Sequence, residues 1–157
     1  FNRQQVDWIA ERGGYDAPVW LKIDTGMGRL GLNPDELDEA VSVLSSRVSE
    51  IGLMSHFASA DTPDAQQNEQ QHQCFEALGR GYSLSRSFAN SAAILSRPQD
   101  HYDLVRPGIM LYGSAPLAGK TAAQLGLRPV MALYARLIEM KQLKAGDSVG
   151  YSATWTA

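Results

Sequence analysis

One pattern recurs along the first 115 residues of the chain: a short apolar run, a polar or glycine-containing corner, and then a segment with helical spacing. The apolar runs lie at residues 18–24, 50–58, 86–90 and 102–113. Helical patterns follow the first three runs, over residues 33–48, 65–81 and 91–97. Alternation of strands with helices favours a parallel sheet covered by helices, because parallel strands need crossover connections. The sequence therefore predicts the α/β class.

The ends of the expected helices carry recognisable signals. Asn33 is a candidate N-cap, and Pro34 suits the first helical position, where no backbone donor is needed. Gly79 or Gly81 is expected to end the helix over residues 65–81. These signals support the helical segments independently of the apolar spacing.

The pattern changes after residue 114. Residues 128–143 and 148–157 resemble antiparallel strands joined by the turn KAGD, with no helix between them. A closed (β/α)8 barrel needs about 250 residues, so four units amount to part of one. We expect a partial (β/α)8 barrel over residues 1–116 and the beginning of an all-β domain over 117–157.

Both ends of the sequence lie inside predicted elements. The chain opens without Met in a helical pattern and stops in an alternating run, GYSATWTA. We interpret it as an internal piece of a larger protein. A small protein with ragged ends is the alternative.

Charge and cysteine content restrict the class of protein. The formal net charge is −3, from 14 Lys and Arg against 17 Asp and Glu, and there is no basic run. Nucleic acid and anionic membrane are therefore unfavourable partners. The single cysteine, Cys74, excludes an intramolecular disulfide and fits a reducing cytoplasm. No apolar run approaches 18 residues, so we expect a soluble, cytoplasmic protein.

Every predicted strand ends in polar side chains. Active sites of parallel α/β folds lie at the carboxyl ends of the strands, in the loops that lead to the helices. We therefore expect one site to collect the polar groups of the four corners, which are Lys22, Asp24, Thr25 and Arg29; Ser55 and His56; Asn90 and Ser91; and Arg106 with Gly108.

The third and fourth corners suit an anion. A hydroxyl and free backbone N–H groups at a helix start attract phosphate, and barrel enzymes often bind phosphate with the loops after their last two strands. Gly108 would let a backbone N–H approach an oxyanion closely. The alternative is that Asn90 or Ser91 simply caps a short helix. Dispersed histidines and one cysteine show no ligand spacing, so no metal site is expected.

Three ionisable residues among apolar neighbours leave alternatives open. Lys22 interrupts an apolar strand, so it needs a partner, a modification that removes its charge, or a place at the open end of the sheet. Arg106 either forms a structural ion pair, with Asp103 for example, or holds an anion or a ring nitrogen. His56 is either a satisfied core histidine or a site residue.

Six ordered motifs resemble the alanine racemases across essentially the whole chain. They are LKIDTGMGRLGL, GLMSHFASADTPD, FANSAA, DLVRPGIMLYG, LRPVMALYARL and LKAGDSVGYSATWTA. The resemblance implies a pyridoxal 5′-phosphate enzyme with an eight-stranded α/β barrel and a C-terminal β domain. The chain would then supply the second half of the barrel and the start of that domain.

The resemblance also implies catalytic roles in the first two corners. Lys22 matches a barrel lysine that the family often carries as a carbamate, an anion able to hold Arg29. Arg29 matches the arginine that orients the substrate carboxylate and the cofactor's phenolic oxygen. His56 matches the histidine between the arginine on the pyridine side and the catalytic tyrosine.

The other two corners match the residues that bind the cofactor. Arg106 matches the arginine facing the pyridine nitrogen, which stays unprotonated because a guanidinium can only donate. Ser91, Gly108 and Ile109 match phosphate-binding positions, and Asn90 supports them indirectly at most.

Tyr151 matches the second catalytic base, which in the family reaches the cofactor from the partner subunit of a head-to-tail homodimer. The family usually has Gly after this tyrosine, and Ser152 stands here instead; Tyr134 replaces an expected small residue. The implied reaction is two-base interconversion of L- and D-alanine, which supplies D-alanine for peptidoglycan.

The family's cofactor-anchoring lysine lies in a motif of the form V-K-A-N-A-Y-G, which does not occur in these 157 residues. We therefore predict that the chain made alone is marginally folded and inactive. The alternatives are a related racemase with another substrate, such as serine or a broader set, and a truncated non-catalytic chain.

Overall fold

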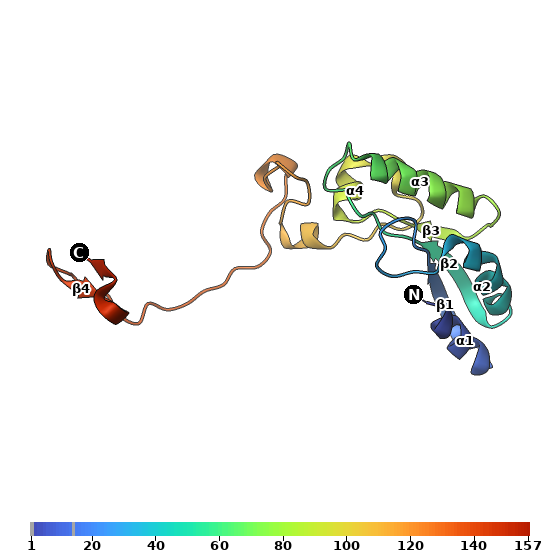
Figure 1. The fold of residues 1–157 in the computed structure, drawn as a ribbon, viewed down its shortest axis with the longest axis horizontal. Coiled ribbons are helices and arrows are strands. Elements are labelled where there is room, and N and C mark those ends of the chain that lie inside the picture. The colour runs from blue at the N-terminus through green and yellow to red at the C-terminus, as the bar shows by residue number, and fades with distance from the viewer. Residues whose placement is uncertain (1, 14) are drawn as a thin grey trace.

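A three-stranded parallel sheet forms the centre of the protein (Figure 1). The computed structural model describes residues 2–13 and 15–157. The strands are β1 (Tyr15–Lys22), β2 (Val48–Met54) and β3 (Ser85–Ser87), and their order in the sheet is β1-β2-β3. Leu21 pairs with Leu53, and Leu53 with Arg86, so each strand lies beside its successor in the chain. The predicted α/β class is confirmed.

Helices connect and cover these strands. They are α1 (Arg3–Glu11), α2 (Leu37–Leu44) after the 3-10 turn η1 (Pro34–Glu36), α3 (Gln66–Gly79) and α4 (Ser91–Ser96). The backbone N–H of Asn33 donates to the Glu36 carboxylate at 2.7 Å, and this hydrogen bond stabilises the start of η1. Helix α3 ends at Gly79, as expected. Helix α2 is shorter than predicted, because the chain already joins the sheet at Val48.

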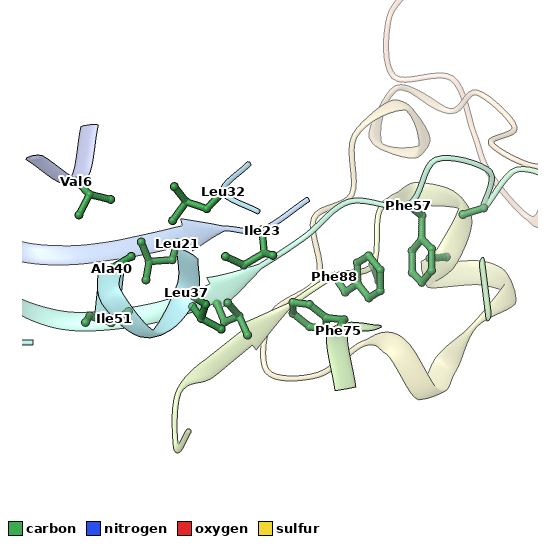
Figure 2. Close-up of a cluster of buried hydrophobic side chains, with 14 of the residues drawn as sticks. Val6, Leu21, Ile23, Leu32, Leu37, Ala40, Ile51, Phe57, Phe75 and Phe88 are labelled. Carbon is green, nitrogen blue, oxygen red and sulfur yellow. The ribbon is translucent and has the colours of Figure 1, made fainter. Parts of the chain in front are cut away.

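The buried side chains form one core with an aliphatic and an aromatic part (Figure 2). The aliphatic part packs α1 and α2 against β1 and β2 through Val6, Leu21, Ile23, Leu37, Ala40, Leu44 and Leu53. Phe57, Phe75 and Phe88 make the aromatic part, with the rings of Phe57 and Phe88 stacked at 3.8 Å between centroids. The Phe57 and Phe88 rings follow the carboxyl ends of β2 and β3, so the core extends beneath the corners.

The predicted strand over residues 102–113 is wrong. The N–H groups of Asp103 and Leu104 both donate to the carbonyl of Arg86, and the Arg106 N–H donates to Ala89, which is no regular ladder. Pro107 has no N–H to continue a ladder. The chain then turns into the 3-10 helix η3 (Ile109–Tyr112), so this run lies beside β3 without becoming a strand.

The predicted strand over residues 128–143 is also wrong. This segment has no regular secondary structure, and Leu133 and Ile138 are 101% and 99% exposed. A strand exists only with a hydrogen-bonded partner, and within residues 2–13 and 15–157 none pairs with this run. The antiparallel pairing lies further along instead, between β4 (Ser148–Val149) and β5 (Trp155–Thr156). Residues 127–144 have no regular structure, and Figure 1 shows a long extended connection leading to this small hairpin.

Shorter elements complete the chain: the 3-10 turns η2 (Pro98–Asp100), η4 (Ala123–Leu125) and η5 (Tyr151–Ala153). In the described part of the chain, no helix is long and apolar enough to cross a membrane.

Candidate active site

A cavity of about 440 Å³ lies where the corners after β2 and β3 meet the segment beside β3. Three separate stretches of the chain meet there, as expected for the carboxyl ends of parallel strands. The predicted site residues that line the cavity are His56, Asn90, Ser91, Arg106, Gly108 and Ile109.

Arg106 is the cation of this cavity. Its guanidinium donates to the Ser87 hydroxyl and to the carbonyl of Ser55, so it spans the carboxyl ends of β2 and β3. Burial lowers its pKa below the ordinary value. The suggested ion pair with Asp103 is wrong, because that carboxylate accepts from the backbone N–H of Arg86 at 2.7 Å. Among the described residues no carboxylate lies within ion-pair distance of Arg106.

Lys22 is the last residue of β1 and is 5% exposed. Burial lowers its pKa, and the positive charges of Arg106 and Arg29 lower it further, while Asp24 opposes them. The side chain is therefore buried at the carboxyl end of β1, in the field of two other cations. This placement corresponds to one of the sequence alternatives and makes an anion favourable here.

Arg29 lies in the exposed part of the first corner and does not line the cavity. Its charge still reaches Lys22 and His56, since it lowers the pKa of both groups. As unmodified cations, Lys22 and Arg29 repel each other. The contact that a carbamate on Lys22 would make with Arg29 stays a prediction.

Asp24 organises the first corner, a role that sequence reasoning missed. Its carboxylate accepts from the N–H groups of Gly26, Met27 and Gly28 at 2.8–2.9 Å. Burial raises the pKa of Asp24, but these N–H groups and the charge of Lys22 outweigh it, so the pKa falls below its ordinary value. Gly31 has φ +135°, and a Cβ there would lie 2.5 Å from the backbone nitrogen of Asp24, so the corner requires glycine at that position.

His56 lies half-buried at the cavity and is not a core histidine. Its pKa is lowered to about 4, first by burial and then by the positive charges of Arg106, Lys22 and Arg29. The imidazole is therefore neutral at physiological pH. A neutral ring beside three cations can occupy the site without adding to their repulsion.

The sequence left open whether Asn90 and Ser91 cap a helix or bind an anion, and the structure gives the two residues different roles. The Asn90 side chain accepts from the N–H of Ala93 at 3.0 Å, so it caps α4. The Ser91 hydroxyl oxygen accepts from the N–H of Gly108 at 2.7 Å and from that of Met110 at 3.4 Å. Its own hydrogen remains for another acceptor. The Gly108 N–H is thus engaged with Ser91 and not directed at an external anion.

Gln71 is a second residue that sequence reasoning missed. It is fully buried on α3 and bonds to both the first and second corners. Its position four residues before the buried Phe75 places it on the same face of the helix, and this spacing is the signal that could have found it.

Tyr151 is not brought to the cavity. It lies in η5 between β4 and β5 and is 97% exposed. Figure 1 shows β4 far from the three-stranded sheet. Across residues 2–13 and 15–157, no group of three or more His, Cys, Asp or Glu side chains is placed to hold a metal ion.

Comparison with known proteins identifies the family and agrees with the α/β fold. Residues 1–116 match the family "Alanine racemase, N-terminal domain". The biosynthetic alanine racemase of Pseudomonas aeruginosa is 50% identical over 148 residues, which is 92% of this chain and 41% of that protein. The crystal structure of biosynthetic alanine racemase from that organism superposes with a TM-score of 0.84 at 47% identity, covering 98% of this chain and 44% of the other.

A structure of alanine racemase from Bartonella henselae with covalently bound pyridoxal phosphate has a TM-score of 0.78 at 28% identity, over 98% of this chain and 44% of that one. The chain therefore spans roughly two fifths of the length of the relatives it matches.

Proposed function

Because this chain belongs to the alanine racemase family, we propose that it forms part of a pyridoxal 5′-phosphate enzyme that interconverts L- and D-alanine. The observation that carries the proposal is the cavity at the carboxyl ends of the sheet, which Arg106 and Asp61 line and which lies near the further positive charges of Lys22 and Arg29. Arg106 lines it without a carboxylate partner among the described residues, and Lys22 and Arg29 add positive charge. Such a field suits a ligand with a phosphate and a carboxylate.

The residues of the cavity fit the cofactor chemically. Its volume of about 440 Å³ lies in the range of small-molecule and cofactor sites. Ser91 has a hydroxyl hydrogen available for a phosphate oxygen, and Gly108 and Ile109 line the same part of the cavity. We propose that these three residues form the phosphate position, with Ser91 donating its hydroxyl hydrogen, Gly108 holding Ser91 through its own N–H, and Asn90 supporting them through the start of α4.

When bound, pyridoxal phosphate withdraws electrons from the α-carbon of the amino acid that it carries. Arg106 would face its ring nitrogen, and a guanidinium donates without giving up its proton, so that nitrogen stays unprotonated. Arg29 would hold the substrate carboxylate, and Lys22, turned from a cation into an anion as a carbamate, would hold Arg29. His56 is neutral and would pack between Arg106 and the catalytic tyrosine.

Tyr151 is proposed to move a proton at the substrate's α-carbon in the partner subunit of a homodimer. Its exposed place on the terminal hairpin is compatible with action outside its own cavity. The domain division proposed is a partial (β/α)8 barrel over 1–116 and the start of an all-β domain over 117–157. A cytoplasmic location and D-alanine supply for peptidoglycan complete the proposal.

The anchoring lysine motif lies outside these 157 residues, so the proposed activity belongs to a complete protein that contains them. The test is racemisation of L-alanine by the complete protein, with the products separated on a chiral column. A panel including L-serine distinguishes a related racemase of other or broader specificity. The 157-residue chain with added cofactor should show no turnover. Absence of alanine racemisation by the complete protein would overturn the proposal.

A further inference from the structure

We propose that Gln71 is a positioning residue that fixes the corner after β2 and, through it, the place of His56 at the cavity. Its amide forms hydrogen bonds on both sides of one short stretch of backbone. The Nε2 group donates to the carbonyl of His56 at 2.9 Å, and Oε1 accepts from the N–H of Ala58, also at 2.9 Å. The amide therefore acts as a clamp that closes around residues 56–58.

The same amide reaches the first corner. Its Nε2 lies 3.3 Å from the hydroxyl oxygen of Thr25, which lies 2.8 Å from the Ser55 hydroxyl. The Ser55 hydroxyl donates to the carbonyl of Ile23 at 2.8 Å, so its only hydrogen is used. Thr25 must therefore donate to Ser55, and Gln71 to Thr25. Every donor in this buried chain has one assigned acceptor.

The chain also reaches the cation of the cavity. The carbonyl of Ser55 accepts from the guanidinium of Arg106. Gln71 thus connects the carboxyl ends of β1 and β2, and Arg106 bonds to the same serine. Half-buried Gln67, one turn earlier on α3, also bridges the two corners, because it donates to the carbonyl of Gly26 at 2.9 Å and accepts from the Ser59 hydroxyl at 2.7 Å. Gln71 is the fully buried bridge, and it is the one that bonds to the backbone of His56 itself.

Helix α3 provides a fixed base for this clamp. On the helix surface His72 Nδ1 lies 2.5 Å from the Asp100 carboxylate, which also accepts from Arg97 at 2.5 Å. Phe75, one turn after Gln71, packs in the aromatic part of the core. These contacts hold α3 without Gln71, so removal of the Gln71 amide should loosen the corner and leave the helix in place.

Replacement of Gln71 by Met removes both ends of the clamp while keeping the length of the side chain. The His56 carbonyl and the Ala58 N–H then have no partner in the core and gain by turning towards water. His56 moves with them, away from the burial that lowers its pKa and from Arg106, whose charge lowers it as well.

The experiment is an NMR titration of the His56 ring in the complete protein that contains this chain, prepared without cofactor. The His56 pKa should rise from about 4 towards the ordinary 6.5 in Gln71→Met. Gln73→Met is the matched control, because Gln73 is exposed on the same helix and its side chain donates to Glu69 at 3.0 Å, away from both corners. The His56 pKa should not change in this variant.

A second variant keeps the proposal testable if Gln71→Met does not fold. Thr25→Val keeps the shape of Thr25 but removes the acceptor of Gln71, so it should raise the His56 pKa by a smaller amount. A lower melting temperature with an unchanged His56 pKa would mean that Gln71 only stabilises the core, and would overturn the proposal. An unchanged titration in Thr25→Val, where only that variant folds, would overturn it too.

Only the catalytic consequence rests on the proposed function. In the complete protein, Gln71→Met should lower kcat more than it raises KM, because His56 is proposed to act beside the reacting groups. The titration uses no cofactor and no substrate, so its failure is distinguishable from failure of the racemase proposal.

Discussion

Replacing Phe88 by Ala is expected to lower the free energy of unfolding by about 3–5 kcal/mol. The Phe88 side chain is fully buried between two other rings. Phe57 stacks on it at 3.8 Å between centroids with an interplanar angle of 12°, and Phe75 lies tilted at 4.7 Å. The substitution removes the apolar surface of the ring and leaves a void that these rigid neighbours cannot fill. Each lost aromatic pair accounts for about 0.5–1.5 kcal/mol of the total.

This loss is large on the scale of a small domain, whose unfolding free energy is about 5–15 kcal/mol. The control is Tyr134→Ala, which also removes an aromatic ring, but one that is 89% exposed in the extended connection. The stability should change there by no more than about 0.5 kcal/mol. The contrast separates packing in the core from the general effect of removing an aromatic residue.

The assay is urea unfolding followed by the fluorescence of the 3 tryptophans. Midpoints are compared at a common slope, because a change of slope would report a different compactness of the unfolded state. A loss below about 1 kcal/mol for Phe88→Ala would refute the packing described for the aromatic part of the core.

Three further predictions concern the first corner. The pKa of Asp24 is depressed in the folded chain, so its stabilising effect is complete above the ordinary 3.8 and is lost as the pH falls through the folded value. Urea midpoints of the unaltered chain should therefore fall more steeply below pH 3.8 than those of Asp24→Asn. Gly31→Ala should cost about 1–3 kcal/mol or more in urea unfolding, because its φ is +135° and its Cβ would lie 2.5 Å from a backbone nitrogen. Lys22→Met should raise the His56 pKa more than Arg29→Met does in NMR titration, since the charge of Lys22 has the larger effect on His56; the reverse order would contradict the electrostatics described.

Local sequence signals located most of the regular elements. Apolar runs that end in polar corners became β1, β2 and β3, and the helical patterns became α1 to α4. Asn90 shows why these predictions succeed: its side chain bonds to a backbone group three residues away, so the sequence alone contains both partners. Residues 102–113 and 128–143 failed for the opposite reason. They have apolar spacing suited to strands. A strand, however, needs a hydrogen-bonded neighbour from another part of the chain, and its own residues do not show whether that neighbour exists.

The candidate site also has features that the sequence predicted and features that it did not. Active sites of parallel α/β folds lie at the carboxyl ends of the strands, and this rule correctly predicted that His56, Ser91 and Arg106 share one cavity. It did not foresee that Asp24 would hold its corner through backbone N–H groups, nor that Gln71 would clamp a corner from a helix. Those roles arise from contacts between side chain and backbone, which residue type alone does not specify.

The sequence by itself determined the α/β class, the family, and which polar residues end the strands, because periodicity and ordered motifs are local properties of the chain. Only the tertiary structure decided which partners Arg106 has and whether His56 is charged. It showed that Arg106 bonds to Ser55 and Ser87 and not to Asp103, and that burial beside cations lowers the pKa of His56 to about 4. Burial and electrostatic fields depend on distances between segments far apart in the chain, and those distances exist only once the chain has folded.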